Sequence, residues 1–215
     1  MNQLRLLASR QFGPLFATQF FGALNDNVFR FAIIVFVTFK MPEYSASDTK
    51  SLLAITAGIF ILPFFLISGV AGQLADKYEK SSIVRTLKNI EIALAFLAGI
   101  GFYFQSYPAL LVILFLMGTQ STFFGPLKYS LLPQHLKTSE LTGANGLIQA
   151  GTYAAIIVGG FIGGTMIGSS ETTEPKLMLV MCAIACAGRI AAKFIPHAES
   201  NAPHLKVTLN PILSG

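Results

Sequence analysis

The chain has 215 residues, of which 53% are hydrophobic and only 12% are charged, about half of the ~25% charged residues of an ordinary soluble domain. This composition excludes an ordinary water-soluble domain, because too few polar residues are present to cover its surface, and it predicts an all-α membrane protein. The formal net charge of +5 does not indicate a nucleic-acid partner, since the basic residues are dispersed at the ends of apolar segments.

A helix that crosses a membrane needs about 20 mainly apolar residues. Six stretches of this kind follow one another, at residues 12–39, 52–75, 83–104, 108–124, 141–167 and 177–195. We therefore expect a bundle of six transmembrane helices over residues 1–195. Residues 196–215 are expected to form a cytoplasmic tail or the start of a central linker.

The distribution of positive charge predicts the orientation of these spans, because cytoplasmic segments hold the excess of Lys and Arg. With the N-terminus in the cytoplasm, eleven of the fifteen basic residues fall on the inner side and three on the outer side. Both ends of the segment are then cytoplasmic. The inner residues are Arg5, Arg10, Lys77, Lys80, Arg85, Lys88, Lys128, Lys137, Arg189, Lys193 and Lys206, and the outer ones are Lys40, Lys50 and Lys176.

The first span carries a polar cluster at its centre, Asn25-Asp26-Asn27-Val28-Phe29-Arg30. Insertion scales assign roughly 2.5–3.5 kcal/mol to an Asp or Arg at that depth. Asp26 and Arg30 stand at i,i+4 spacing and can neutralise each other, and Gln19 and Gly22 extend the same stripe. The stripe is either a buried ion pair that fixes packing or the wall of a hydrated substrate or ion path. We favour the path, because ionisable groups inside membranes usually have a function.

A second signal lies between the second and third spans, in the segment Gly72-Gln73-Leu74-Ala75-Asp76-Lys77-Tyr78-Glu79-Lys80. Gly72 permits close helix approach, and Asp76 at the start of a turn can accept backbone N–H bonds while it attracts nearby cations. We interpret Gly72, Asp76, Lys77 and Lys80 as a conformational latch. This segment resembles the loop signature of the major facilitator superfamily, although Glu79 and Ser81 depart from its Gly and cation.

Two further segments carry a narrower resemblance: residues 20–27, around Asn25-Asp26-Asn27, and residues 118–133, which include Gln120 and Lys128. Both are similar to the bacterial lysophospholipid transporter branch of the superfamily, some of whose members are fused to a 2-acylglycerophosphoethanolamine acyltransferase. The resemblance implies the N-terminal half of a transporter in the bacterial inner membrane, with its C-terminal six-helix half missing from this chain. It implies that a lysophosphatidylethanolamine-like lipid moves to the inner leaflet by alternating access.

The resemblance also implies site residues. Asn25, Asp26 and Asn27 would belong to the polar centre of the path, with Arg30 on the same stripe. Lys128 would attract the lipid phosphate, or else act as an ordinary cytoplasmic anchor. Gln120 would hydrogen-bond a head group or a neighbouring helix. Asp26 is the carboxylate expected to take any coupling H⁺ or Na⁺.

Other side chains receive simpler interpretations. Lys88 and Glu91, with Arg85, predict a local ion pair at the cytoplasmic end of the third span. Glycines of the fifth span, such as Gly159 and Gly163, predict close helix packing. No cofactor or metal is expected, because the histidines are not clustered and no nucleotide-binding or hydrolase motif occurs.

We therefore predict a transporter and not an enzyme. Two alternatives stay open at this point, the membrane domain of a fused lysophospholipid acyltransferase and a generic drug or metabolite exporter of the same superfamily.

Overall fold

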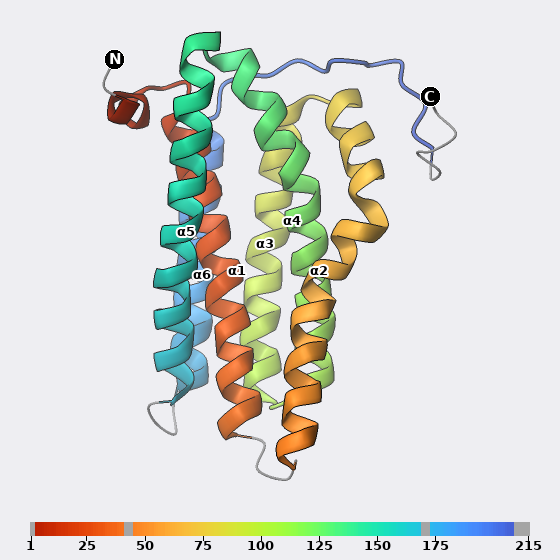
Figure 1. Ribbon diagram of the computed structural model, residues 1–215, viewed down its shortest axis with the longest axis vertical. Coiled ribbons are helices and arrows are strands. Elements are labelled where there is room, and N and C mark those ends of the chain that lie inside the picture. The colour runs from red at the N-terminus through yellow and green to blue at the C-terminus, as the bar shows by residue number, and fades with distance from the viewer. Residues whose placement is uncertain (1–2, 41–44, 169–172, 209–215) are drawn as a thin grey trace.

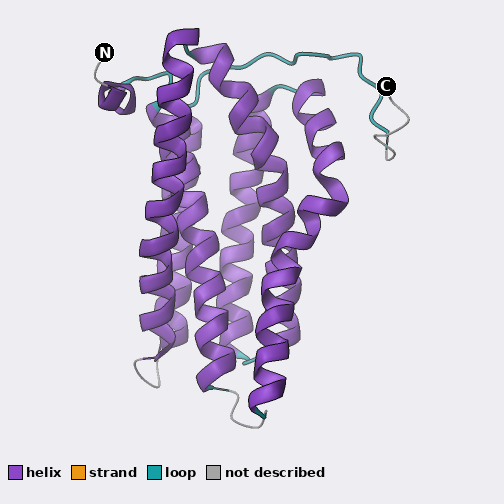
Figure 2. Cartoon of the chain, viewed as in Figure 1, coloured by secondary structure: helices purple, strands orange, loops and turns teal. Residues whose placement is uncertain are grey.

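The computed structural model describes residues 3–40, 45–168 and 173–208, and in this part of the chain it is all-helical (Figure 2). A short 3₁₀ helix, η1 (Gln3–Ala8), precedes six α-helices that run up and down beside one another (Figure 1). Their bounds are α1 (Gly13–Phe39), α2 (Ala46–Lys77), α3 (Lys80–Tyr103), α4 (Tyr107–His135), α5 (Thr138–Gly168) and α6 (Thr173–Lys193).

Five of these helices, α1, α2, α4, α5 and α6, are long and apolar enough to cross a membrane, and α3 is not among them. Helix α3 differs because it carries several charged side chains along its first half, including Lys80, Lys88 and Glu91, which are buried. The sequence predicted six spans, and five of the six helices qualify as membrane spans by their length and composition.

The largest difference from the expected boundaries concerns α4, which was expected to end at residue 124. The helix continues through Pro126 and Pro133 to His135. Residues 126–135, which the predicted span left to the following connection, therefore belong to the helix. Helix α2 likewise contains Pro63, and Figure 1 shows the bend in that helix that a missing backbone N–H permits.

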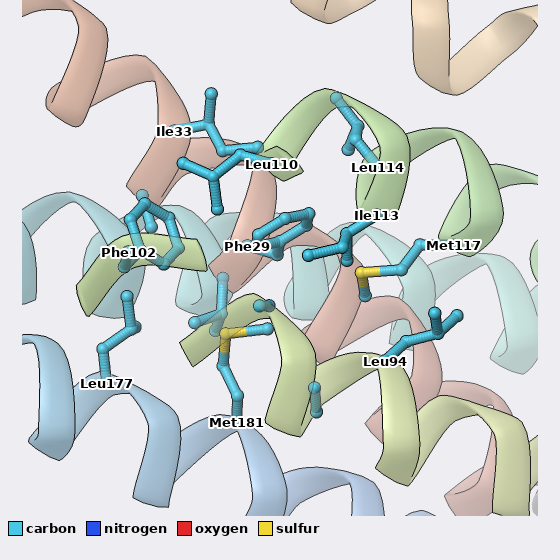
Figure 3. Packing of buried hydrophobic residues seen from close by; sticks show 14 of the residues in the cluster. Phe29, Ile33, Leu94, Phe102, Leu110, Ile113, Leu114, Met117, Leu177 and Met181 are labelled. Atoms are coloured by element: carbon cyan, nitrogen blue, oxygen red, sulfur yellow. The ribbon is translucent and has the colours of Figure 1, made fainter. Parts of the chain in front are cut away.

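Apolar side chains from α1, α3, α4 and α6 fill the centre of the bundle (Figure 3). Phe29 on α1 packs edge-on against Phe102 on α3, with ring centroids 5.8 Å apart, and Phe36 makes a second edge contact with the same ring. Leu110 and Met117 extend this core along α4. Because these aromatic and aliphatic groups lock the helices against one another, they hold the polar residues of α1 in a fixed position.

Glycines set the spacing between α1 and α5, as the sequence predicted. A Cβ atom added to Gly159 would lie 2.9 Å from the carbonyl oxygen of Leu24, and one added to Gly163 would lie 3.0 Å from the backbone nitrogen of Ala32. The two backbones are therefore in direct contact, which is the arrangement that small residues at i,i+4 spacing allow.

Residues 196–208 run across the ends of the helices (Figure 1). The backbone N–H of Lys80 donates to the carbonyl of Ala198, and the N–H of Ala202 donates to the carbonyl of Asp76. Farther along, the N–H of Thr208 donates to the side chain of Gln73. This part of the tail is thus fastened to the end of α2 and the start of α3, whereas residues 209–215 lie outside the described part of the chain.

Candidate functional site

A cavity of about 250 Å³ lies halfway along the bundle and is lined by five of the helices. Helix α1 supplies the polar wall, α2 supplies two phenylalanine rings, and α3, α4 and α5 complete the boundary. Its lining residues are Gln19, Gly22, Ala23, Asp26, Asn27, Arg30, Phe60, Phe64, Lys88, Gln120, Ser121, Phe124, Gly125, Lys128, Thr152 and Ile156.

The polar stripe identified on the first span faces this cavity. Gln19, Gly22, Asp26 and Arg30 all contribute to its lining, because residues three and four apart share one face of a helix. Asn27 also lines the cavity, and its amide donates to the carbonyl of Ala23 at 2.7 Å. Asn25 is different, since its side chain is fully buried and lies outside the lining.

The expected neutralisation of Asp26 by Arg30 is wrong, because the two side chains form no ion pair in the described part of the chain. Asp26 accepts a hydrogen bond from the hydroxyl of Ser121 on α4 at 2.6 Å. The guanidinium of Arg30 instead lies over the ring of Phe60 on α2, 4.7 Å from its centroid. Helical spacing brings Asp26 and Arg30 near each other, but each side chain interacts with a residue on a neighbouring helix, Asp26 with Ser121 and Arg30 with Phe60.

Asp26 is left with unused hydrogen-bonding capacity. Its Oδ1 atom is buried and has no hydrogen-bond partner among the described residues, and the same holds for both polar atoms of the Asn25 side chain. A buried polar atom without a partner costs roughly 1–3 kcal/mol, and more when it is charged. Asp26 also lines the cavity, so its carboxylate is the acidic group that a cation or a hydrogen-bond donor in the cavity would meet.

Helix α4 presents the other two residues that the sequence singled out. Lys128 lies two turns before the end of α4, lines the cavity and places its ammonium 5.0 Å from the ring centroid of Tyr129. Lys128 therefore lies within a helix and beside the cavity, and its role as a phosphate contact or as a cytoplasmic anchor stays a prediction. Gln120 is buried and donates to the carboxylate of Glu91 on α3 at 3.2 Å. The cavity lining thus carries three cationic side chains, Arg30, Lys88 and Lys128, and the carboxylate of Asp26.

Sequence reasoning missed the location of Lys88 and Glu91. They do form the expected pair, with 2.5 Å between Nζ and Oε2, but each side chain is only 1% exposed. Lys88 also lines the cavity, while Arg85 turns back to Glu79 at 3.5 Å. The available signal was their distance from the start of the helix, because α3 begins at Lys80 and Lys88 therefore lies two turns inside the bundle.

Two of the residues interpreted as a latch, Asp76 and Lys80, form hydrogen bonds with the tail. Asp76 accepts from the amide of Asn201 at 3.1 Å and not from turn backbone. The buried ammonium of Lys80 donates to the carbonyl of Glu199 at 2.6 Å and to Asn201 Oδ1 at 3.1 Å. One side chain of the tail, Asn201, therefore joins α2 to α3.

Two other assignments in this signature need correction. An added Cβ at Gly72 would meet no atom within 4 Å among the described residues, so Gly72 does not mediate close helix contact here. Lys77 lies over the ring of Tyr78 at 5.5 Å.

Glu79, which departs from the family signature, takes the capping role expected of Asp76. Its carboxylate accepts from the backbone N–H groups of Ser81 and Ser82 at the start of α3, and from the N–H of Ala198. Burial acts to raise the pKa of Glu79, but hydrogen bonds from the Ser81 hydroxyl and from these three N–H groups outweigh it, so the pKa falls below its ordinary value.

Comparison with known proteins identifies the family. The family model of the Major Facilitator Superfamily matches residues 15–209, which is most of the chain. The chain belongs to the major facilitator superfamily. Superfamily membership together with the long apolar helices makes it a multi-pass membrane protein.

Several curated relatives in the superfamily carry one name, lysophospholipid transporter LplT. The protein of Serratia proteamaculans is 26% identical over 205 residues, which cover 94% of this chain and 47% of the relative. That of Escherichia fergusonii is 28% identical and covers 92% and 46%. That of Salmonella typhimurium is 29% identical and covers 86% and 42%. The chain thus spans about half the length of the curated relatives it matches, and no solved structure matches it.

Proposed function

We propose that this chain is the six-helix N-terminal half of an inner-membrane transporter that moves lysophospholipids to the cytoplasmic leaflet. The observation that carries the proposal is a cavity with charged walls, halfway along an apolar bundle, in a chain of a transporter superfamily. In many transporters of this kind the substrate site lies near the bilayer midplane, between two repeats that rock against each other. The present cavity would be one half of such a site.

The charge distribution supports a cytoplasmic location for both ends of the segment. Even without Lys88 and Lys128, which line the cavity, nine of the fifteen basic residues stand on the proposed inner side against three on the outer side. This excess follows the positive-inside pattern. Helix α3 would cross the membrane as the sixth span, with its charged groups turned into the bundle and away from lipid.

The chemistry of the cavity suits a zwitterionic or anionic lipid head group. The cations of Arg30 and Lys128 could each attract a phosphate, and the carboxylate of Asp26 could attract the ammonium of an ethanolamine. A lined path removes much of the free energy cost of carrying such charges through hydrocarbon. The acyl chain would stay against lipid, because a cavity of about 250 Å³ has room for the head group alone.

The test uses the protein encoded by the complete open reading frame and radiolabelled lysophosphatidylethanolamine, offered to spheroplasts that express it. Asp26→Asn keeps the size of the side chain and removes its charge, so uptake should fall to background while the amount of inserted protein stays normal. Glu199→Gln is the matched control, because its carboxylate is exposed outside the cavity. Normal uptake by Asp26→Asn would refute the role of this carboxylate. Wild-type uptake measured with and without a Na⁺ gradient, and with the H⁺ gradient collapsed, would show whether transport depends on either ion.

The matched family and the named relatives favour transport over the acyltransferase alternative. Competition experiments separate lysolipid transport from general export. Excess lysolipid should suppress the uptake, whereas small cationic drugs should not. The opposite result would favour a drug exporter of the same superfamily.

A further inference from the structure

A buried ion pair on α3 lies beside the cavity but outside the residues assigned above to substrate contact. Lys88 and Glu91 are each 1% exposed, with 2.5 Å between Nζ and Oε2. The Oε1 atom of Glu91 has no hydrogen-bond partner among the described residues. An incompletely satisfied buried pair adds little to folding stability, and apolar residues of similar size often replace such pairs without loss. Stability alone therefore gives no reason for this pair.

The surroundings of Lys88 are shaped to its side chain. A Cβ added to Gly22 on α1 would collide with the ammonium of Lys88, and one added to Gly188 on α6 would lie 3.7 Å from its Cδ. On the side of α4, the ammonium lies 5.3 Å from the ring centroid of Phe124. Two glycines and a ring thus form a slot that holds Lys88 in one place among four helices.

The carboxylate of Glu91 connects this slot to the cavity. Its Oε2 accepts from the amide of Gln120 at 3.2 Å. The hydroxyl of Ser121, the next residue, donates its single hydrogen to Asp26 Oδ2 at 2.6 Å, and the same hydroxyl oxygen lies 3.4 Å from the oxygen of the Gln120 amide. A continuous chain of polar contacts therefore runs from α3 through α4 to the carboxylate on α1.

We propose that Lys88 and Glu91 are positioning residues of the transport site. Lys88 fixes Glu91, and Glu91 holds the amide of Gln120 at the cavity wall, beside the Ser121 hydroxyl that donates to Asp26. The Gln120 amide and the bond between Ser121 and Asp26 are thereby kept next to each other at the cavity wall. This inference rests on the proposed function, because a positioned Asp26 matters only if the cavity takes a substrate.

The test is the double variant Lys88→Met with Glu91→Leu, which removes both charges and leaves neither one unpaired. Thermal stability in detergent and membrane insertion should match those of the wild type. The KM for lysophosphatidylethanolamine should rise roughly tenfold, which is the size expected when one hydrogen bond to a charged group is lost. A double variant with normal stability and a normal KM would show that the pair does not position the transport site and would overturn the proposal.

The matched control is Lys40→Met with Glu174→Leu, which removes the ion pair between the outer ends of α1 and α6, 2.9 Å between Nζ and Oε1. This control should change neither quantity. If the wild type itself takes up no lysolipid, the proposed function fails. If the wild type transports and the first double variant keeps its KM, only the positioning role fails.

A second variant keeps the proposal testable if the double variant does not fold. Gln120→Met cuts the contact between Glu91 and Ser121 without disturbing any charge. It should raise the KM by a similar factor, and the triple variant should be no worse than either alone, because members of one chain of contacts are not additive. Fully additive effects would show that Gln120 acts independently of the pair and would overturn the proposal.

Discussion

The contact between α1 and α5 offers a comparison between two neighbouring glycines of the same helix. A Cβ added to Gly163 would lie 3.0 Å from the carbonyl carbon of Val28 and from the nitrogen of Ala32, and closer still to the Val28 oxygen. These are backbone atoms, so the helices must separate to admit a methyl group. A Cβ added to Gly164 would meet only Val35 Cγ2, at 4.0 Å.

The magnitude follows from two opposing terms. Replacing Gly by Ala in a helix gains up to ~1 kcal/mol of intrinsic propensity, and this gain is the same at both positions. Forcing a methyl group into a packed contact costs about 1–3 kcal/mol, and this cost applies only at Gly163. Gly163→Ala should therefore be less stable than Gly164→Ala by about 1–3 kcal/mol, or roughly 2–12 °C in Tm for a chain of this size.

The assay compares both variants in the same detergent and at the same heating rate, following helix content by circular dichroism. The chain contains no tryptophan, so intrinsic tryptophan fluorescence is not an option. Gly164→Ala should unfold at or slightly above the wild-type temperature, and Gly163→Ala should unfold below it. Equal midpoints for the two variants would refute the inference that backbone contact at Gly163 sets the spacing between α1 and α5.

Two further predictions concern the cavity and the tail. Lys128→Gln removes a cation from the cavity wall and should raise the KM for lysophosphatidylethanolamine about tenfold or more. Lys137→Gln, at an exposed position outside the cavity, should leave uptake kinetics unchanged. Equal effects of the two substitutions would count against a contact between Lys128 and the lipid phosphate. Because the pKa of Glu79 is lowered in the folded protein, its contacts with the tail should be complete above its ordinary pKa and should be lost as pH falls through the lowered one. The fluorescence anisotropy of a dye attached at position 208 should therefore drop in acid. The variant Glu79→Gln should show the lower anisotropy already at neutral pH. Anisotropy that is independent of pH and unaffected by Glu79→Gln would contradict the proposed contact between Glu79 and the tail.

Much of the bundle could be predicted because membrane helices are long apolar runs whose glycines and central charges stand out. The stripe through Asp26 and Arg30 was assigned to one helix face, and both side chains do line a cavity. Helix α4 extends past the predicted end of the fourth span at residue 124, because the prediction followed the apolar run alone and the helix continues through Pro126 and Pro133. The helix accommodates both prolines because each Pro lacks only one backbone donor, and packing of α4, mainly against α2 and α3, stabilises the rest.

The sequence by itself determined the class of protein. Three features can be identified from the order of the residues alone: apolar runs long enough to cross a membrane, an excess of positive charge on one side, and a polar cluster in the middle of a span. The tertiary structure decided which charges meet. Asp26 accepts a hydrogen bond from Ser121 on α4, the guanidinium of Arg30 lies over the ring of Phe60, and Lys88 lies between Gly22 on α1 and Gly188 on α6. Such partners lie far apart in sequence, so only the packing of the helices determines the distances on which hydrogen bonds and ion pairs depend.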